Sequence, residues 1–203
     1  MSVDSVLARI AQIQEGLQPR KPPVPSSVSG AGFQAVLGQA TKGAPGAWSL
    51  AGAGAPAGQT AGLRALAYAQ QEVGVAEQPP GSNDAPRIAE YRSSTAGSGI
   101  GPWCGYFVSW AAKMAGAPLG EAGQGFGAVS AAWDWAQRTG RAIPPTQPPQ
   151  AGDLIVWDGT HIGIVESVDP DGKIHTIEGN SSNAVTRRTH SANGDGATGW
   201  IRI

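Results

Sequence analysis

The chain is poor in cysteine and in charged residues. Cys104 is the only cysteine among 203 residues, so no disulfide can form within the chain and a cysteine-rich zinc site is excluded. Charged residues make up 14% of the chain and give a formal net charge of -1, with no long basic run. The electrostatic signature of a nucleic-acid-binding protein is therefore missing.

Long apolar runs are also missing. No segment approaches the roughly 18 apolar residues of a membrane span. The N-terminal residues lack the basic segment and apolar core of a secretory signal peptide. We therefore expect a protein that either stays inside the cell or leaves it by another route.

Apolar and flexible residues are distributed unevenly, which divides the chain into three parts. Residues 1–17 carry apolar side chains at helical spacing and predict one amphipathic helix, which either binds a protein partner or packs on the main domain. Residues 18–60 are rich in Pro, Gly and Ala, and they bury too little apolar surface to offset ordering entropy. We expect them to form a mostly disordered linker, followed by a folded domain over residues 61–203.

Within the folded domain, helical patterns come first and strand patterns follow. Helices are predicted over residues 62–73, 86–92, 104–116 and 129–139. From residue 152 the apolar period changes to two, which predicts five short strands in the sequences DLIVWD, HIGIVESV, KIHTIEG, AVTRRTH and TGWIRI. Helices followed by consecutive hairpin strands indicate an α+β domain with an antiparallel sheet.

Cys104 stands at the start of the predicted helix 104–116. Unpaired backbone N–H groups and the helix dipole favour an anion at this position. They therefore favour the thiolate, which is the nucleophilic form of cysteine. The same N–H groups are suited to hold the oxyanion of a tetrahedral intermediate. The alternative is a buried, inert thiol, since free cysteine is usually buried.

A nucleophilic thiolate needs a base, and the base needs a group that orients it. His161 is the best placed of the three histidines because it opens a strand, whereas His175 lies within a strand and His190 ends a polar one. Glu178 ends a strand beside a glycine turn and is the candidate for orienting His161. Asp153 is the rival carboxylate, and we interpret it as a structural residue at a strand start.

Residues 61–203 resemble the CHAP domain, the cysteine- and histidine-dependent amidohydrolase/peptidase branch of the papain-like NlpC group. The similar segments are GVAEQPPGSNDAPRIAEY, GPWCGYFVSWAAKMAG, AGDLIVWDGTHIGIVESV, IHTIEGNSSNAV and TGWIRI, and their order and spacing agree across the domain. The resemblance implies N-terminal helices packed on a C-terminal antiparallel sheet, with a cleft between them. It also implies that Cys104 is the nucleophile and His161 its base.

Further site residues follow from the same comparison. Glu178 and Asn180 fall on the polar positions that orient the histidine in this family, and either can contact the ring. Asn83 falls on a recurrent position of an upstream loop and is expected to bind substrate. Trp103 and Trp157 are two aromatic candidates for the cleft, with core packing as the alternative.

The implied function is hydrolysis of peptidoglycan by an amidase or endopeptidase that cuts a stem peptide or its amide link to the glycan. Segment 77–103 has no run of spaced acids, so we expect no calcium loop, no metal site and no cofactor. Two alternatives remain open. One is a non-catalytic wall-binding or flagellar and export-associated scaffold with the same fold, and the other is a cytoplasmic enzyme acting on a different amide.

The N-terminal sequence carries a second resemblance. SVDSVLARIAQIQ and FQAVLGQA are similar to the heads of peptidoglycan hydrolases associated with bacterial flagella. This resemblance implies a bacterial protein that the flagellar export apparatus carries to the cell wall without a signal peptide.

Overall fold

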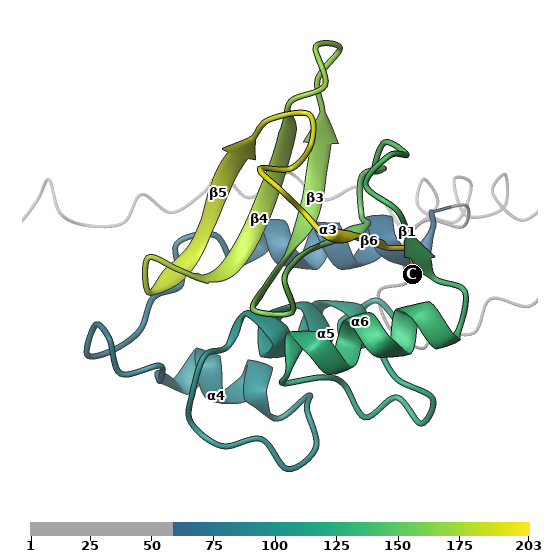
Figure 1. The fold of residues 1–203 in the computed structure, drawn as a ribbon. Coiled ribbons are helices and arrows are strands. Elements are labelled where there is room, and N and C mark those ends of the chain that lie inside the picture. Colours follow the sequence, from purple (N-terminus) through teal and green to yellow (C-terminus); the bar gives the residue numbers. More distant parts are fainter. Residues whose placement is uncertain (1–58) are drawn as a thin grey trace, which may run out of the picture. The chain divides into compact units, whose positions relative to one another are not determined.

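The computed structural model describes residues 59–203 (Figure 1). The predicted helix 1–17, and the predicted linker up to residue 58, lie outside the described residues. Within residues 59–203, four helices precede a six-stranded sheet, which confirms the predicted α+β class. No helix of this part of the chain is both long and apolar enough to cross a membrane.

The helices begin and end close to the predicted residues. They are α3 (Ala61–Gln71), α4 (Pro86–Arg92), α5 (Cys104–Met114) and α6 (Val129–Arg138). Thr60 caps α3, because its Oγ1 accepts a hydrogen bond from the Leu63 N–H at 3.3 Å. All residues of α5 from Cys104 to Ala112 are buried, so α5 is the central helix, in contact with α3, α4, α6 and the sheet.

The sheet is antiparallel throughout. Its strands are β1 (Ala142–Ile143), β2 (Leu154–Trp157), β3 (His161–Val168), β4 (Ile174–Ser181), β5 (Ala184–His190) and β6 (Gly199–Ile201). Their order across the sheet is β1-β6-β2-β3-β4-β5, and all neighbours run antiparallel. Five of these strands were predicted. Strand β1 was missed because two residues carry no periodic pattern.

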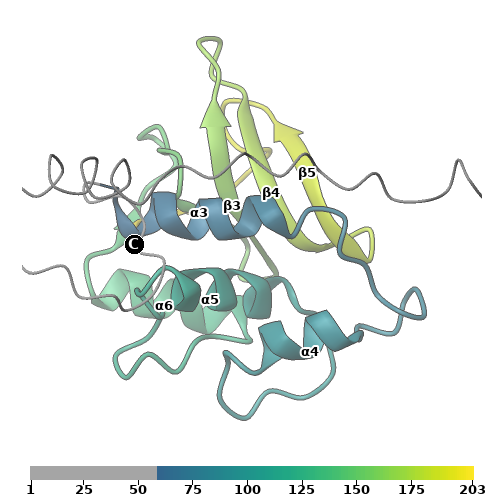
Figure 2. The ribbon, with the colours of Figure 1, turned by 180° about the vertical axis from the view of Figure 1, so that it is seen from behind.

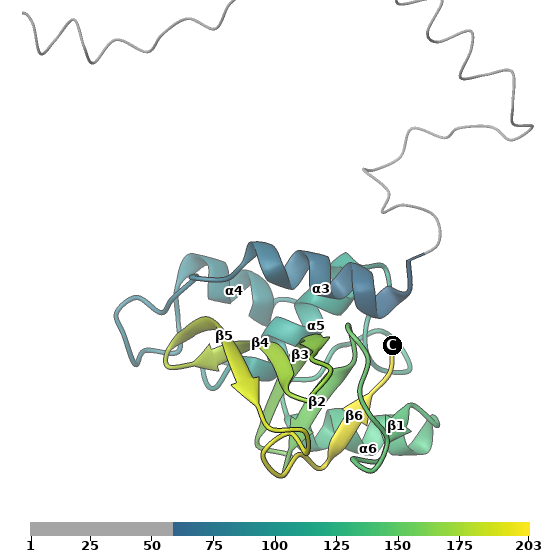
Figure 3. The same ribbon diagram turned by 90° about the horizontal axis from the view of Figure 1, so that it is seen from above.

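The two faces of the sheet bury different clusters, since alternate residues of a strand point to opposite faces. The face that packs on the helices includes Leu154, Ile164 and Ile177. The opposite face carries a smaller cluster that includes Ile155, Val165 and Trp200. Figures 2 and 3 show α3, α4 and α5 gathered on one side of the sheet.

Strand β4 lies very close to α5 at Gly179. A Cβ atom at this position would lie 2.6 Å from Cβ of Phe107 and 2.9 Å from Cζ3 of Trp103, so only glycine leaves enough room. The contact joins the end of β4, which carries Glu178, to the first turn of α5, which carries Cys104.

Candidate active site

Cys104 is the first residue of α5, as predicted. The N–H of Phe107 donates to the carbonyl of Trp103 at 3.0 Å, and the N-cap residue Trp103 provides no side-chain cap. The N–H groups of Cys104, Gly105 and Tyr106 therefore precede the first hydrogen bond of the helix. They provide donors and a positive dipole end beside the thiol.

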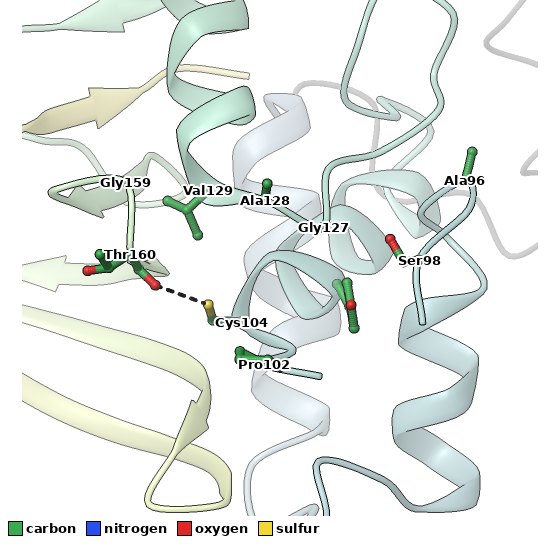
Figure 4. Close-up of a pocket in the computed structure, with 10 residues that line it drawn as sticks. Ala96, Ser98, Pro102, Cys104, Gly127, Ala128, Val129, Gly159 and Thr160 are labelled. Atoms are coloured by element: carbon green, nitrogen blue, oxygen red, sulfur yellow. Dashed lines mark hydrogen bonds between the residues drawn. The ribbon is translucent and has the colours of Figure 1, made fainter. Parts of the chain in front are cut away.

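The thiol lies at the wall of a cleft of about 520 Å³ (Figure 4). In Figure 4 the sulfur points toward the Thr160 carbonyl oxygen, to which the thiol donates a hydrogen bond at 3.9 Å. The other lining residues are small or uncharged, among them Ser98, Pro102, Tyr106, Gly127 and Val129. Apart from Cys104 itself, no Asp, Glu, Lys, Arg or His side chain is among the residues that line the cleft, so the cleft suits an uncharged segment of a substrate.

His161 is the first residue of β3 and brings its imidazole to the thiol. Its Nε2 lies 2.8 Å from Oε2 of Glu178, so Nδ1 is the ring nitrogen that remains available to Cys104. Burial by itself lowers the pKa of His161. The hydrogen bonds and charges of Cys104 and Glu178 outweigh burial and raise this pKa to about 9. The ring therefore carries a proton at neutral pH.

Glu178 is a buried carboxylate that accepts three side-chain hydrogen bonds. His161 donates to Oε2 at 2.8 Å, and Oε1 accepts from the Thr176 hydroxyl at 2.6 Å and from Nε2 of His190 at 2.7 Å. Burial by itself raises the pKa of Glu178, but these hydrogen bonds outweigh it and lower the pKa to about 2. Glu178 is thus ionised over the working range and holds the imidazole ring in one orientation.

Of the two candidates for orienting the base, Glu178 is the one that contacts the His161 ring. Glu178 hydrogen-bonds to His161, whereas Asn180 lies two residues further along β4, with a φ of 58°. Among residues 59–203, no side-chain hydrogen bond joins Asn180 to the ring. The predicted catalytic role of Asn180 remains a prediction.

Trp157 packs against the base instead of lining the cleft beside the thiol. Its ring centroid lies 5.4 Å from that of His161, with 28° between the planes, and 4.9 Å from that of His190. Its Nε1 donates to the Gly194 carbonyl at 2.6 Å. Trp157 therefore supports two imidazole rings, and its predicted role in substrate binding remains a prediction.

Trp103 lies in the core, which agrees with the core-packing alternative, and its predicted role in substrate binding remains a prediction. It is 0% exposed, so its ring offers no surface to a ligand. The ring packs on Tyr91 with 5.9 Å between centroids, and Nε1 donates to Oε1 of Glu77 at 2.9 Å. Asn83 is half-buried, and its N–H donates to Oε2 of the same Glu77 at 3.0 Å. Its predicted contact with substrate is not tested by these bonds.

The rival residues lie in other hydrogen-bond networks. Asp153 accepts hydrogen bonds from Arg202 Nη2 and from the Gln150 N–H, both at 2.8 Å, which confirms its structural role. His175 bonds to Asp169 Oδ2 at 2.9 Å. Among residues 59–203, no group of three or more His, Cys, Asp or Glu side chains is arranged to hold a metal ion.

His190 is the site residue that the sequence interpretation missed. It ends β5, the strand that pairs with the strand of Glu178, and its Nδ1 lies 2.9 Å from Asp195 Oδ2. One feature of the sequence could have revealed His190, namely its position at the end of the strand that follows the strand of Glu178. Pairing of those two strands was predicted, but the side-chain contact between them was not.

The arrangement can perform acyl transfer by a cysteine nucleophile. A thiol at a helix start, an imidazole whose pKa the thiol raises, and a carboxylate hydrogen-bonded to that imidazole form the set that such chemistry requires.

Comparison with known proteins agrees with this reading of the fold. Residues 95–180 match the family model of the CHAP domain, and this segment contains Cys104, His161 and Glu178. The chain therefore carries a CHAP domain.

One similar solved structure is that of the peptidoglycan hydrolase RipB from Mycobacterium tuberculosis, at 20% sequence identity and a TM-score of 0.43. The match covers 70% of this chain and 64% of the RipB chain, so the chain spans less than two thirds of that protein. The comparison with curated proteins finds no match.

Proposed function

We propose that this chain is a peptidoglycan hydrolase in which Cys104 cleaves an amide bond. Three observations carry the proposal. The Cys104 thiol lies at the wall of a cleft of about 520 Å³, Cys104 raises the pKa of His161, and Nε2 of His161 lies 2.8 Å from Oε2 of Glu178. The CHAP domain match supports the class of substrate.

The first half of the reaction forms an acyl-enzyme. The Cys104 thiolate attacks the amide carbonyl carbon, and the resulting oxyanion lies near the free N–H groups at the start of α5. The C–N bond then breaks, and protonated His161 gives its Nδ1 proton to the leaving amine. Glu178 stabilises the imidazolium until that transfer.

The second half releases the acyl group. Neutral His161 takes a proton from water, and the hydroxide formed attacks the thioester carbon. The C–S bond breaks, a carboxylic acid leaves, and the thiolate–imidazolium pair is restored. Every proton in the cycle passes through one ring nitrogen, since Glu178 occupies the other.

The walls of the cleft favour small uncharged groups beside the scissile bond. Gly127 lies where a Cβ atom would come within 2.6 Å of Ser98 Oγ and 2.8 Å of Tyr106 Cε1, so the wall at residue 127 has no space for a side chain. A peptide with short apolar side chains fits such a cleft better than one with charged side chains.

The experiment is clearing of purified cell-wall sacculi by the full chain. The wild type should lower the turbidity, and Cys104→Ala should abolish clearing while the protein stays folded. Mass spectrometry of the released fragments then distinguishes an amidase, which frees the peptide from the glycan, from an endopeptidase, which cuts within the peptide. Clearing by both proteins contradicts the cysteine mechanism, and wall binding without clearing by the wild type supports the scaffold alternative.

Export to the cell wall through the flagellar apparatus is part of the same proposal and rests on the N-terminal sequence. Fractionation of flagellated cells that carry the tagged full chain tests it. The chain should appear outside the cytoplasm in cultures without lysis, and retention in the cytoplasm would contradict the proposed route.

A further inference from the structure

His190 is held between two carboxylates. Its Nε2 lies 2.7 Å from Glu178 Oε1, and its Nδ1 lies 2.9 Å from Asp195 Oδ2. An ionised carboxylate only accepts hydrogen bonds, so each ring nitrogen must carry a hydrogen to make its bond. With both nitrogens protonated, the ring is an imidazolium. Its side chain is 12% exposed, so water screens this charge only weakly.

The loop after β5 is built to keep this ring in place. Oδ1 of Asp195 accepts hydrogen bonds from the Ser191 hydroxyl at 2.6 Å and from the Ser191 N–H at 3.1 Å. The Trp157 ring packs on His190, and its Nε1 bonds to the Gly194 carbonyl of the same loop. The loop therefore anchors Asp195 from within and is attached to the sheet at Trp157.

Each carboxylate oxygen of Glu178 bonds to a different histidine. Oε1 is occupied by His190 and by the Thr176 hydroxyl, and Oε2 is left to His161. A carboxylate without the bonds on Oε1 would be free to rotate about its terminal torsion, because that torsion is broad. The bond from His190 therefore limits the directions from which Glu178 can hold the base.

We propose that His190 is a positioning residue of this site: as an imidazolium held by Asp195, it fixes the Glu178 carboxylate and offsets part of its charge at His161. The proposal rests on the proposed function, since it assigns a role in the same reaction. It concerns a residue that is not among those lining the cleft and that bonds to Glu178 instead.

The charges around the two rings define the expected effect. His190 faces Glu178 from β4 and Asp195 from its own loop, and the side chain from β2 is the uncharged Trp157. His161 faces Cys104 from α5 and Glu178 from β4. The hydrogen bond to Glu178 is the largest cause that raises the pKa of His190. Removing the His190 cation makes the remaining protons of the site harder to remove.

The test compares His190→Ala and His190→Gln with the wild type. The control is His175→Gln, which replaces the imidazole of a similar pair on the same sheet, His175 Nε2 to Asp169 Oδ2 at 2.9 Å. Two quantities are measured against pH: kcat and KM for wall hydrolysis, and the rate at which iodoacetamide alkylates Cys104. Because Cys104 is the only cysteine, alkylation reports on the site without any substrate.

His190→Ala should lower kcat roughly tenfold or more, with KM nearly unchanged, because the base is misplaced and the cleft is intact. Both pH profiles should move to higher pH by about half a unit. Glutamine keeps an N–H donor for Glu178 but no charge. His190→Gln should therefore recover part of kcat and keep the shift in pH.

Profiles of both His190 variants that superimpose on the wild type would overturn the proposal. So would an equal shift in His175→Gln, since that control does not contact Glu178. If the wild type does not hydrolyse cell wall, the proposed function fails, but the alkylation profiles still decide the role of His190. If His190→Ala does not fold, the shift in His190→Gln decides it.

Discussion

Replacing Gly163 with alanine tests how strongly the proposed reaction depends on the position of Glu178 beside the base His161. Gly163 lies on β3 against the side chain of Glu178. An added Cβ would lie 2.7 Å from Glu178 Cγ and 3.3 Å from the Ile177 carbonyl oxygen. Ordinary contacts begin at 3.4 Å, so the Glu178 side chain has to move by about 0.7 Å.

Glu178 cannot move that far without losing its bonds. Its oxygens bond to Thr176, His190 and His161 at 2.6 to 2.8 Å. A shift of about 0.7 Å extends the bond to His161 beyond the usual 3.2 Å limit, and the ring is then free to turn from Cys104. Since a misplacement of about 1 Å costs roughly 100-fold in rate, we expect kcat to fall 10- to 100-fold. Overpacking should also cost about 1–3 kcal/mol of stability.

The assay is the initial rate of sacculus clearing, with thermal unfolding measured on the same preparations. Gly99→Ala is the matched control, because Gly99 has no atom within 4 Å of an added Cβ and precedes the cleft residue Pro102 by three positions. A folded Gly163→Ala protein whose rate stays within about threefold of the wild type would refute the reasoning. An equal loss in Gly99→Ala would show that the effect is not specific to Glu178.

Three further predictions concern the same hydrogen-bonded set. Glu178→Gln removes the negative charge and places an N–H donor against the donors of His161 and His190, so kcat should fall about 100-fold or more. Asn180→Ala should lower kcat by less than about tenfold. Equal losses in the two variants would contradict the assignment of Glu178. Activity should decline as pH rises through about 9, because His161, whose pKa is raised to about 9, loses the proton that the leaving amine needs; a rate still increasing above that pH would refute this. In acid, the lowered pKa of Glu178 contributes stability that is complete above its ordinary value of 4.5 and is lost as pH falls toward about 2. Melting temperatures of the wild type and Glu178→Gln should therefore converge as pH falls from 4.5 toward about 2.

The helices and strands could be predicted because each has a local cause. Helix α5 begins at Cys104, shortly after Pro102, and the chain leaves it through Gly116, whose φ of 74° is costly for other residues. The long strands show their alternation over seven or eight residues. Strand β1 has only two residues and is defined by its pairing with β6. No local sequence pattern predicts that pairing.

The outcome for the two tryptophans shows the limit of local patterns. Trp103 and Trp157 each stand beside a site residue in the chain or in the sheet, and both carry an N–H that needs a partner when buried. Trp103 turns into the core and bonds to Glu77, whereas Trp157 packs on His161 and His190. The direction of each ring depends on neighbours from distant segments, so the sequence offered no means to separate them.

The sequence by itself indicated the class of chemistry that we propose, because its only thiol stands at the start of an amphipathic helix and only three histidines can serve as its base. It also determined the α+β class, because the spacing of apolar residues changes from a helical period to an alternating one along the sequence. Only the tertiary structure showed that Glu178 hydrogen-bonds to His161 and that His190 bonds to the same carboxylate. Those contacts join β3, β4 and β5 through side chains whose directions depend on sheet register and on packing at Gly163.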